Sequence, residues 1–199
     1  NEHFPFGTSR MVDIGYARAR ASRITYVGEL GWELYLPTEF AAGVFDTIEE
    51  AGGPVGLRLC GYHALDSLRM EKGYRSWGHD VTTDETPLDA GLGFAVAWDK
   101  PGGFIGREAL LAQREQGPAH RLVHLRLPAD GPLLHHNEPI WSDGGIVGRV
   151  TSGAYGHTIG APLGLGYVST DQGELDREAL LAREYEVEVA CERIRAQVS

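Results

Sequence analysis

Residues 23–36 read RITYVGELGWELYL, and this stretch decides the first part of the fold. Residues 23–27 are rich in β-forming side chains, and residues 32–36 alternate between apolar and polar as a half-buried strand does. Between them, Gly28-Glu29-Leu30-Gly31 offers two flexible positions, which favour a turn. The stretch therefore predicts a β-hairpin that carries the carboxylate of Glu29 at its tip.

Two helices are expected after this hairpin. Pro37 and Thr38 open the first, with Thr38 as its N-cap, and Gly52-Gly53-Pro54 ends it. Apolar side chains at helical spacing give this helix one apolar face, formed by Phe40, Val44, Phe45 and Ile48. The second helix is expected over about residues 61–72, with a stop at Gly73.

The second half of the chain has a different pattern. Residues 74–118 form a loop-rich connector, with a strand expected at residues 94–98 and a short helix from residue 106. Short strands separated by turn residues follow, at residues 121–127, 146–151, 163–168 and 184–191. The fold class is therefore predicted as α+β. An α/β portion with its connector occupies residues 1–118, and a small antiparallel β-barrel occupies residues 119–199.

Composition excludes some classes of function. The net charge of −10 argues against non-specific nucleic-acid binding, which requires a basic surface. No stretch approaches the roughly 18 apolar residues of a membrane span. Cys60 and Cys191 lie in apolar sequence surroundings, so both are expected to be buried thiols in a cytoplasmic protein. The first residue is not Met, so we expect this chain to be a piece of a longer protein.

Two places carry candidate chemistry. Glu29, between two glycines, can accept two hydrogen bonds from a planar pair of N–H groups, which pterin and amino-pyrimidine rings offer; a solvated turn residue is the other interpretation. Residues 74–80 read YRSWGHD, and such aromatic density suits stacking on a flat ring or plugging a domain interface. Adjacency of His79 and Asp80 on a loop does not by itself make a catalytic pair.

Several other signals are weak or missing. His135-His136 has no partner ligands at metal-binding spacing, so no metal site is predicted. No glycine-rich Gly-x-Gly-x-x-Gly unit follows a strand, so the chain has no flavin- or nicotinamide-binding unit of its own. A phosphate loop and a serine nucleophile elbow are likewise missing from the sequence.

At these same residues the sequence resembles a known family. Residues 26–33 (YVGELGWE) resemble the Tyr-x-Gly-Glu-x-Gly-x-Glu motif of glycine-cleavage T proteins. Four further stretches are similar to motifs of that family, in the same order: DSLRMEKGY at 66–74, DETPLDAGL at 84–92, VTSG at 150–153 and LGYV at 165–168. The tryptophans in GELGWE and in EKGYRSW make the chain most like the C-terminal domain of sarcosine and dimethylglycine dehydrogenases.

The resemblance implies a fold and a ligand. It implies part of a ferredoxin-like folate-binding lobe, followed by the barrel, around a tetrahydrofolate cavity. Glu29 matches the family glutamate that hydrogen-bonds the pterin, and Tyr26 is expected to line the same cavity. Tyr74 and Trp77 of the aromatic loop are expected to join them in binding the cofactor.

It also implies a reaction and a partner. In the oxidising subgroup a flavin (FAD) domain of the same chain oxidises an N-methyl amine to an iminium, and tetrahydrofolate takes the one-carbon unit to give 5,10-methylenetetrahydrofolate. The catalytic aspartate of the family precedes the glutamate motif and falls outside this chain, so no catalytic residue is assigned. We therefore expect little activity from these residues alone. Leu65 stands where T proteins often have an arginine, which weakens the implied contact to the folate tail.

Two alternatives remain open at this stage. One is a related aminomethyltransferase or demethylase with another substrate, for example a methylated sulfur compound. The other is a folate-binding module that has no transfer activity.

Overall fold

A computed structural model describes residues 2–169 and 177–199. The chain forms two compact units, Asn1–Asp66 and Ser67–Ser199, and each is described by itself. The connector of residues 74–118 packs within the second unit. One contact that holds it there is a hydrogen bond of 2.9 Å from the amide of Leu122 to the carbonyl of Asp89.

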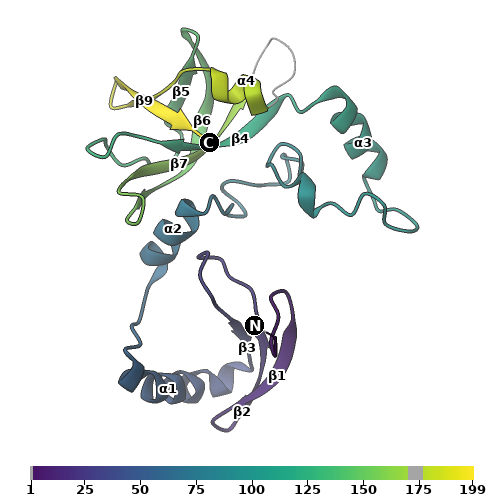
Figure 1. The fold of residues 1–199 in the computed structure, drawn as a ribbon, viewed down its shortest axis with the longest axis vertical. Coiled ribbons are helices and arrows are strands. Elements are labelled where there is room, and N and C mark those ends of the chain that lie inside the picture. The colour runs from purple at the N-terminus through teal and green to yellow at the C-terminus, as the bar shows by residue number, and fades with distance from the viewer. Residues whose placement is uncertain (1, 170–176) are drawn as a thin grey trace. The chain divides into compact units, whose positions relative to one another are not determined.

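The first unit is a three-stranded antiparallel sheet in the order β1-β2-β3 with the helix α1 (Figure 1). The sequence of β2 alternates alanine and arginine, and the alanines are buried while the arginines are exposed. The buried apolar side chains among the described residues of this unit are few: Ala17, Ala19, Ala21 and Val44. The strands are β1 (Ser9–Ile14), β2 (Ala17–Ser22) and β3 (Glu33–Tyr35).

The predicted strand at residues 23–27 is wrong. The ladder between β2 and β3 ends at the pair Ser22↔Glu33. The amide of Ile24 donates a local hydrogen bond to the carbonyl of Ser22 at 3.0 Å, and not one to a partner strand. Residues 23–32 therefore form a long loop between two paired strands. The predicted second strand is confirmed in shorter form as β3, and Glu29 lies in the connecting loop of the hairpin as expected.

The predicted N-cap at Thr38 is also wrong. A 3-10 turn, η1 (Thr38–Phe40), precedes α1 (Ala41–Gly52), and neither has a side-chain cap; the position before η1 is Pro37. Of the predicted apolar face only Val44 is buried, whereas Phe40 and Phe45 are 40% and 48% exposed. A second 3-10 turn, η2 (Gly53–Val55), follows α1.

The second predicted helix is confirmed as α2 (Tyr62–Glu71), which stops at Gly73 with a φ of 62°. The division between the two units falls within α2. The predicted strand at residues 94–98 is wrong, because a 3-10 turn, η3 (Gly93–Ala95), forms there instead. The indole N–H of Trp98 donates a hydrogen bond to the Gly93 carbonyl of this turn. The short helix predicted from residue 106 is α3 (Arg107–Gln116).

A closed barrel in the order β4-β7-β6-β5-β8-β9 forms most of the second unit (Figure 1). The predicted antiparallel barrel, and with it the α+β class, is confirmed. The interior is apolar, and its most buried large side chains are Leu125, Leu134, Ile140, Val150, Val168, Tyr185 and Val187. The strands are β4 (His120–Arg126), β5 (Pro139–Ser142), β6 (Gly145–Gly156), β7 (Ala161–Ser169), β8 (Tyr185–Val189) and β9 (Glu192–Val198), with α4 (Arg177–Ala182) before β8.

Both cysteines are exposed, so the expectation of buried thiols is wrong. Cys191 lies in the tight turn between β8 and β9 with a φ of 66°, and Cys60 lies in the irregular segment before α2. Within the described ranges, no helix has the length and apolar character that a bilayer crossing requires.

Candidate functional site

The first candidate region is the loop of residues 23–32. Its base is held by contacts around Trp32, whose ring centroid lies 6.0 Å from that of Phe4 and 5.8 Å from the guanidinium carbon of Arg23. Gly28 has a φ of 76°, a left-handed conformation that glycine adopts readily, and it turns the chain just before Glu29. Residues 28–31 (GELG) therefore form a turn in the loop that connects the paired strands β2 and β3.

Glu29 is exposed at this turn, and Tyr26 is half-buried in the same loop. The carboxylate of Glu29 makes no hydrogen bond or ion pair with any residue that the structure describes. An ionised carboxylate has acceptor capacity for about four hydrogen bonds. Glu29 can therefore accept a pair of N–H groups from a ligand without first breaking a contact within the protein.

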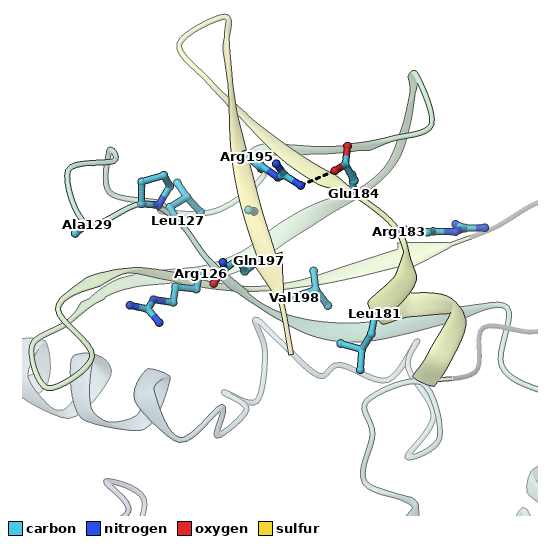
Figure 2. Close-up of a pocket in the computed structure, with 11 residues that line it drawn as sticks. Arg126, Leu127, Ala129, Leu181, Arg183, Glu184, Arg195, Gln197 and Val198 are labelled. Carbon is cyan, nitrogen blue, oxygen red and sulfur yellow. Dashed lines mark hydrogen bonds and ion pairs between the residues drawn. The ribbon is translucent and has the colours of Figure 1, made fainter.

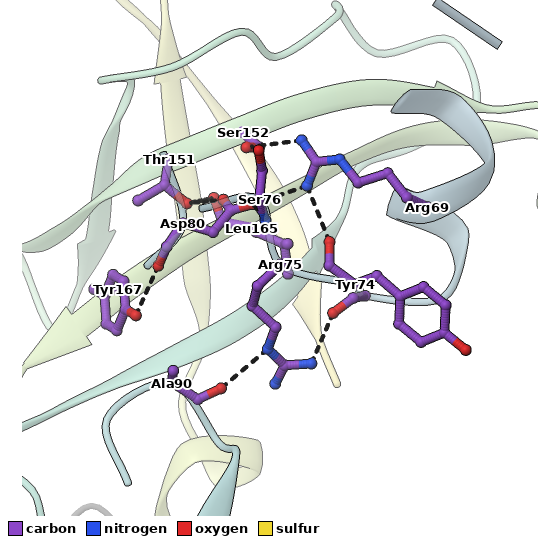
Figure 3. A network of polar contacts seen from close by, with 11 residues as sticks. Arg69, Tyr74, Arg75, Ser76, Asp80, Ala90, Thr151, Ser152, Leu165 and Tyr167 are labelled. Atoms are coloured by element: carbon purple, nitrogen blue, oxygen red, sulfur yellow. Dashed lines mark hydrogen bonds and ion pairs between the residues drawn. The ribbon is translucent and has the colours of Figure 1, made fainter. Parts of the chain in front are cut away.

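The second candidate region, residues 74–80, is organised around one buried carboxylate. Asp80 is fully buried, and its Oδ2 accepts from Arg69 Nη1 and from the amide of Ser76, both at 2.8 Å (Figure 3). Its Oδ1 accepts from the hydroxyl of Thr151 on β6 at 2.5 Å, and its own carbonyl accepts from Tyr167 of β7 at 2.8 Å. Asp80 therefore anchors the loop to α2 and to the barrel, and it is not available as a general base.

Tyr167 is kept as a hydrogen-bond donor in this network. Burial raises the pKa of its phenol, and the nearby carboxylates of Glu85, Asp89 and Asp80 raise it further. Arg69 completes the arrangement, because its Nη2 donates to Ser152 at 3.0 Å and its Nη1 to the Tyr74 carbonyl at 3.1 Å. The loop is thus fixed at both ends by side chains from three elements.

This anchoring leaves the aromatic part of the loop on the surface. Trp77 is 73% exposed, and its backbone forms a bridge with Val81, closed by a 2.8 Å hydrogen bond from Gly78 to the Val81 carbonyl. Tyr74 is half-buried beside Arg69, and His79 is exposed. Of the two predicted ring-binding residues of this loop, Trp77 is the one that presents an open face.

A hollow of about 490 Å³ lies beside Trp77. Arg75 lines it and is held in place by hydrogen bonds to the carbonyls of Ala90 (3.0 Å) and Gly73 (2.7 Å), and burial lowers its pKa. Glu85 also lines it and accepts from the amide and hydroxyl of Thr82, both at 2.7 Å. Burial raises the pKa of Glu85, but these hydrogen bonds outweigh it and lower the pKa overall. The hollow therefore combines a flat ring with one fixed cation and one fixed anion.

The four predicted site residues fall into two pairs. Tyr26 and Glu29 share a loop of the first unit, whereas Tyr74 and Trp77 share a loop of the second. Sequence reasoning did not single out Arg69, Thr151 or Tyr167, which hold the second loop. All three lie inside stretches that resemble T-protein motifs, so those motifs meet at one buried network around Asp80 (Figure 3).

No metal centre emerges from the part of the chain that the structure describes, where no three His, Cys, Asp or Glu side chains group together. His135 and His136 are both exposed in the segment before β5.

The family comparisons agree with this geometry. Residues 1–100 match the GCVT N-terminal domain, and residues 120–199 match the glycine cleavage T-protein C-terminal barrel domain. The chain therefore belongs to the glycine-cleavage T-protein family. The domain boundary of the family lies between residues 100 and 120, and the predicted boundary at residue 118 stays a prediction.

Individual relatives indicate which members of this family the chain resembles. The chain is 44% identical over 190 residues to 4-methylaminobutanoate oxidase (formaldehyde-forming) of Paenarthrobacter nicotinovorans, covering 96% of this chain and 22% of that protein. It is 40% identical to the mitochondrial sarcosine dehydrogenase of Homo sapiens, and the match covers 87% of this chain and 19% of that protein. The crystal structure of the glycine cleavage system aminomethyltransferase T from Bartonella henselae superposes on this chain with a TM-score of 0.83 at 27% identity. The match covers 100% of this chain and 52% of that structure's chain.

These matches make this an aminomethyltransferase-type domain related to the sarcosine-type oxidising enzymes, as its motifs indicated. The chain spans about a fifth of the length of the curated relatives and about half of the solved aminomethyltransferase.

Proposed function

We propose that this chain binds a reduced folate for one-carbon transfer, as part of a flavin-linked enzyme that oxidises an N-methyl amine. The observation that carries the proposal is the exposed carboxylate of Glu29 in the family's glutamate motif, which has no partner among the residues that the structure describes. Two relatives, an oxidase of a methylamino acid and a dehydrogenase of sarcosine, support an N-methyl amine as the substrate class.

The residues present fit this cofactor. Glu29 offers paired acceptors to the N–H edge of a pterin, and the half-buried ring of Tyr26 provides an apolar wall in the same loop. In the second unit, the exposed ring of Trp77 lies beside a hollow lined by the cation of Arg75 and the anion of Glu85, and this ring suits stacking on a flat molecule; Tyr74 lies at the base of that loop. The bound folate would supply the nitrogen atoms that accept the one-carbon unit, whereas these side chains only bind and orient.

The relative that releases formaldehyde favours a second candidate, in which folate is bound but transfer is inefficient. The two candidates share the binding step and differ only in the fate of the one-carbon unit. Measuring formaldehyde against methylenetetrahydrofolate in the full flavin-linked enzyme separates them.

Replacement of Glu29 tests the binding step directly. Glu29→Ala removes hydrogen bonds to a charged acceptor, worth about 1.5–3 kcal/mol, so we expect tetrahydrofolate to bind about 10- to 100-fold more weakly by calorimetry. Glu39→Ala, an exposed glutamate of the same unit, is the matched control and leaves affinity unchanged. Equal affinity of wild type and Glu29→Ala would mean that Glu29 is only a turn residue.

A further inference from the structure

The loop that carries Glu29 is closed at its base by the side chains of its own first and last residues. These residues are Arg23 and Trp32, and the guanidinium carbon of Arg23 lies 5.8 Å from the ring centroid of Trp32. Just outside this contact, the ladder between β2 and β3 ends at the pair Ser22↔Glu33. Glu29 lies within the closed segment, so the contact limits how far its loop can open.

Arg23 is held by both its backbone and its side chain. Its amide donates to the carbonyl of Thr8, and its carbonyl accepts from the amide of Gly7, both at 2.9 Å. Its Nη1 donates to the carbonyl of Phe4. Because these contacts fix the guanidinium, Arg23 offers Trp32 a fixed cationic surface.

Trp32 also contacts a second aromatic ring. Its ring centroid lies 6.0 Å from that of Phe4, with the two planes inclined at 58°, which is a favourable arrangement for an aromatic pair. The guanidinium carbon of Arg10 lies 5.2 Å from the Phe4 ring centroid, so Phe4 is itself held. Trp32 is therefore held by two contacts although it is 46% exposed.

The two arms of the loop also meet closer to Glu29. A β-carbon at position 31 would lie 3.6 Å from the carbonyl oxygen of Ile24 and 3.8 Å from the side chain of Thr25, so Gly31 packs against both residues. Thr25 Oγ1 in turn accepts from the amide of Val27 at 3.2 Å. The arms are therefore packed from the base of the loop up to the turn of residues 28–31.

An exposed arginine contact on the barrel makes a useful comparison. Figure 2 shows the ion pair of Arg195 and Glu184, 2.5 Å apart, in a hollow of about 870 Å³. The two side chains are 73% and 80% exposed, and such pairs hold a geometry only weakly because water competes for both charges. The half-buried Arg23 contacts a carbonyl and a ring instead, so it can fix the direction of a loop.

We propose that Arg23 and Trp32 are positioning residues, which hold Glu29 in the orientation in which it binds its ligand. They act by ordering the loop and need no contact with the ligand themselves. A loop that is ordered before binding loses less conformational entropy on binding, so the affinity is higher. For the identity of the ligand, a reduced folate, this inference rests on the proposed function.

Backbone relaxation of the 199-residue chain without ligand, measured by nuclear magnetic resonance, tests the ordering. We expect order parameters above about 0.7 for the amides of Glu29 and Leu30 in the wild type and below about 0.6 in Trp32→Ala. Trp32→Phe keeps a ring facing Arg23 and should restore the order. If Trp32→Ala unfolds the sheet, Arg23→Gln, which keeps the ring, should show the loss of order. Unchanged order parameters in the folded variants would overturn the proposal.

Tyr35→Ala is the matched control. Tyr35 is also 46% exposed, and its ring centroid lies 4.8 Å from the guanidinium carbon of Arg20, but it belongs to β3 and lies outside the loop. The order of the loop should therefore be unchanged in this variant. An equal loss of order in Tyr35→Ala would show that weakening the sheet is enough to free the loop, and would contradict a specific role for Trp32.

A double-mutant cycle connects the ordering to binding. Trp32→Ala should weaken tetrahydrofolate binding about 3- to 10-fold when Glu29 is present and by less than about twofold in the Glu29→Ala background. Equal weakening in both backgrounds would mean that Trp32 acts independently of Glu29, which would overturn the proposal. Absence of folate binding by the wild type would refute the proposed function alone, because the order parameters decide separately whether Trp32 holds the loop.

Discussion

Asp80 shows how one residue can organise a candidate site without taking part in its chemistry. Its carboxylate is fully buried and receives donors from Arg69, Ser76 and Thr151. Removing one member of a buried ion pair leaves the other charge uncompensated, which is far more costly than losing an exposed pair. The exposed position of Trp77 depends on this anchor three residues away.

Asp80→Asn should therefore destabilise the second unit strongly. We expect a loss of about 3–5 kcal/mol in the free energy of unfolding, measured by urea denaturation of the barrel signal. Asp84→Asn, an exposed aspartate four residues further on, is the control and should change stability by less than about 0.5 kcal/mol. Similar stabilities for the two variants would exclude an anchoring role for Asp80.

Sequence reasoning found Glu29 and Trp77 at the residue scale but not the anchors. Glycines on both sides of Glu29 and the aromatic density of residues 74–80 are visible in the sequence. The buried partnership of Asp80 with Arg69, Thr151 and Tyr167 joins residues up to 87 positions apart. Only the closed barrel brings these side chains together, so no local pattern predicts the contact.

At the scale of elements, the prediction failed where tertiary packing or turn geometry outweighed local propensity. Residues 23–27 have strong β propensity but form a loop, whereas the alanine-rich β2 is a strand because its small side chains are buried in the first unit. The expected strand at residues 184–191 is interrupted by Ala190 and Cys191, both with positive φ. Neither is a residue type that signals such a turn, so β9 was missed.

Glu71 connects two elements and gives the barrel a pH dependence. Its Oε1 accepts from the amides of Thr158 and Ile159 in the turn between β6 and β7, at 2.6 and 3.2 Å. Burial raises the pKa of Glu71, but these hydrogen bonds and the nearby His157 outweigh it and lower the pKa below its usual value. The carboxylate therefore contributes stability above the pKa of the unfolded chain, and this contribution is lost as pH falls through the lower folded pKa.

The expected outcome is a stability difference between wild type and Glu71→Gln that is largest near neutral pH and shrinks on acidification from about pH 5 downward. Urea denaturation at a series of pH values measures it. Glu115→Gln, on the exposed face of α3, should show no such trend. A difference that is constant with pH would mean that the charge of Glu71 does not hold the turn.

At the scale of the whole molecule, the two units differ in how much apolar surface they bury. The barrel buries a continuous cluster of large side chains, whereas the described part of the first unit buries three alanines and Val44. Its aromatic residues Trp32, Tyr35 and Phe45 are each close to half exposed. Local stability follows buried apolar contact, so the first unit should open more readily than the barrel.

Hydrogen exchange of the 199-residue chain measures this difference. Amides of β1, β2 and α1 should exchange at least about 100-fold faster than those of β6 and β7, which corresponds to a difference of about 2.7 kcal/mol in opening free energy. Equal protection of the two units would contradict the account. Binding of a folate to Glu29 and Tyr26 should slow exchange in the first unit, because a ligand stabilises the state that it binds.

The central claim is that Glu29 recognises the pterin ring of a reduced folate. A tetrahydropterin without the benzoyl-glutamate tail tests it most directly, because it retains only the ring edge that the carboxylate would contact. Its affinity should be measured for wild type and Glu29→Ala beside that of tetrahydrofolate, with tryptophan fluorescence as the signal. We predict that the substitution weakens both ligands by the same factor, about 10- to 100-fold. Undiminished pterin affinity in Glu29→Ala, or no binding by wild type, would contradict the claim.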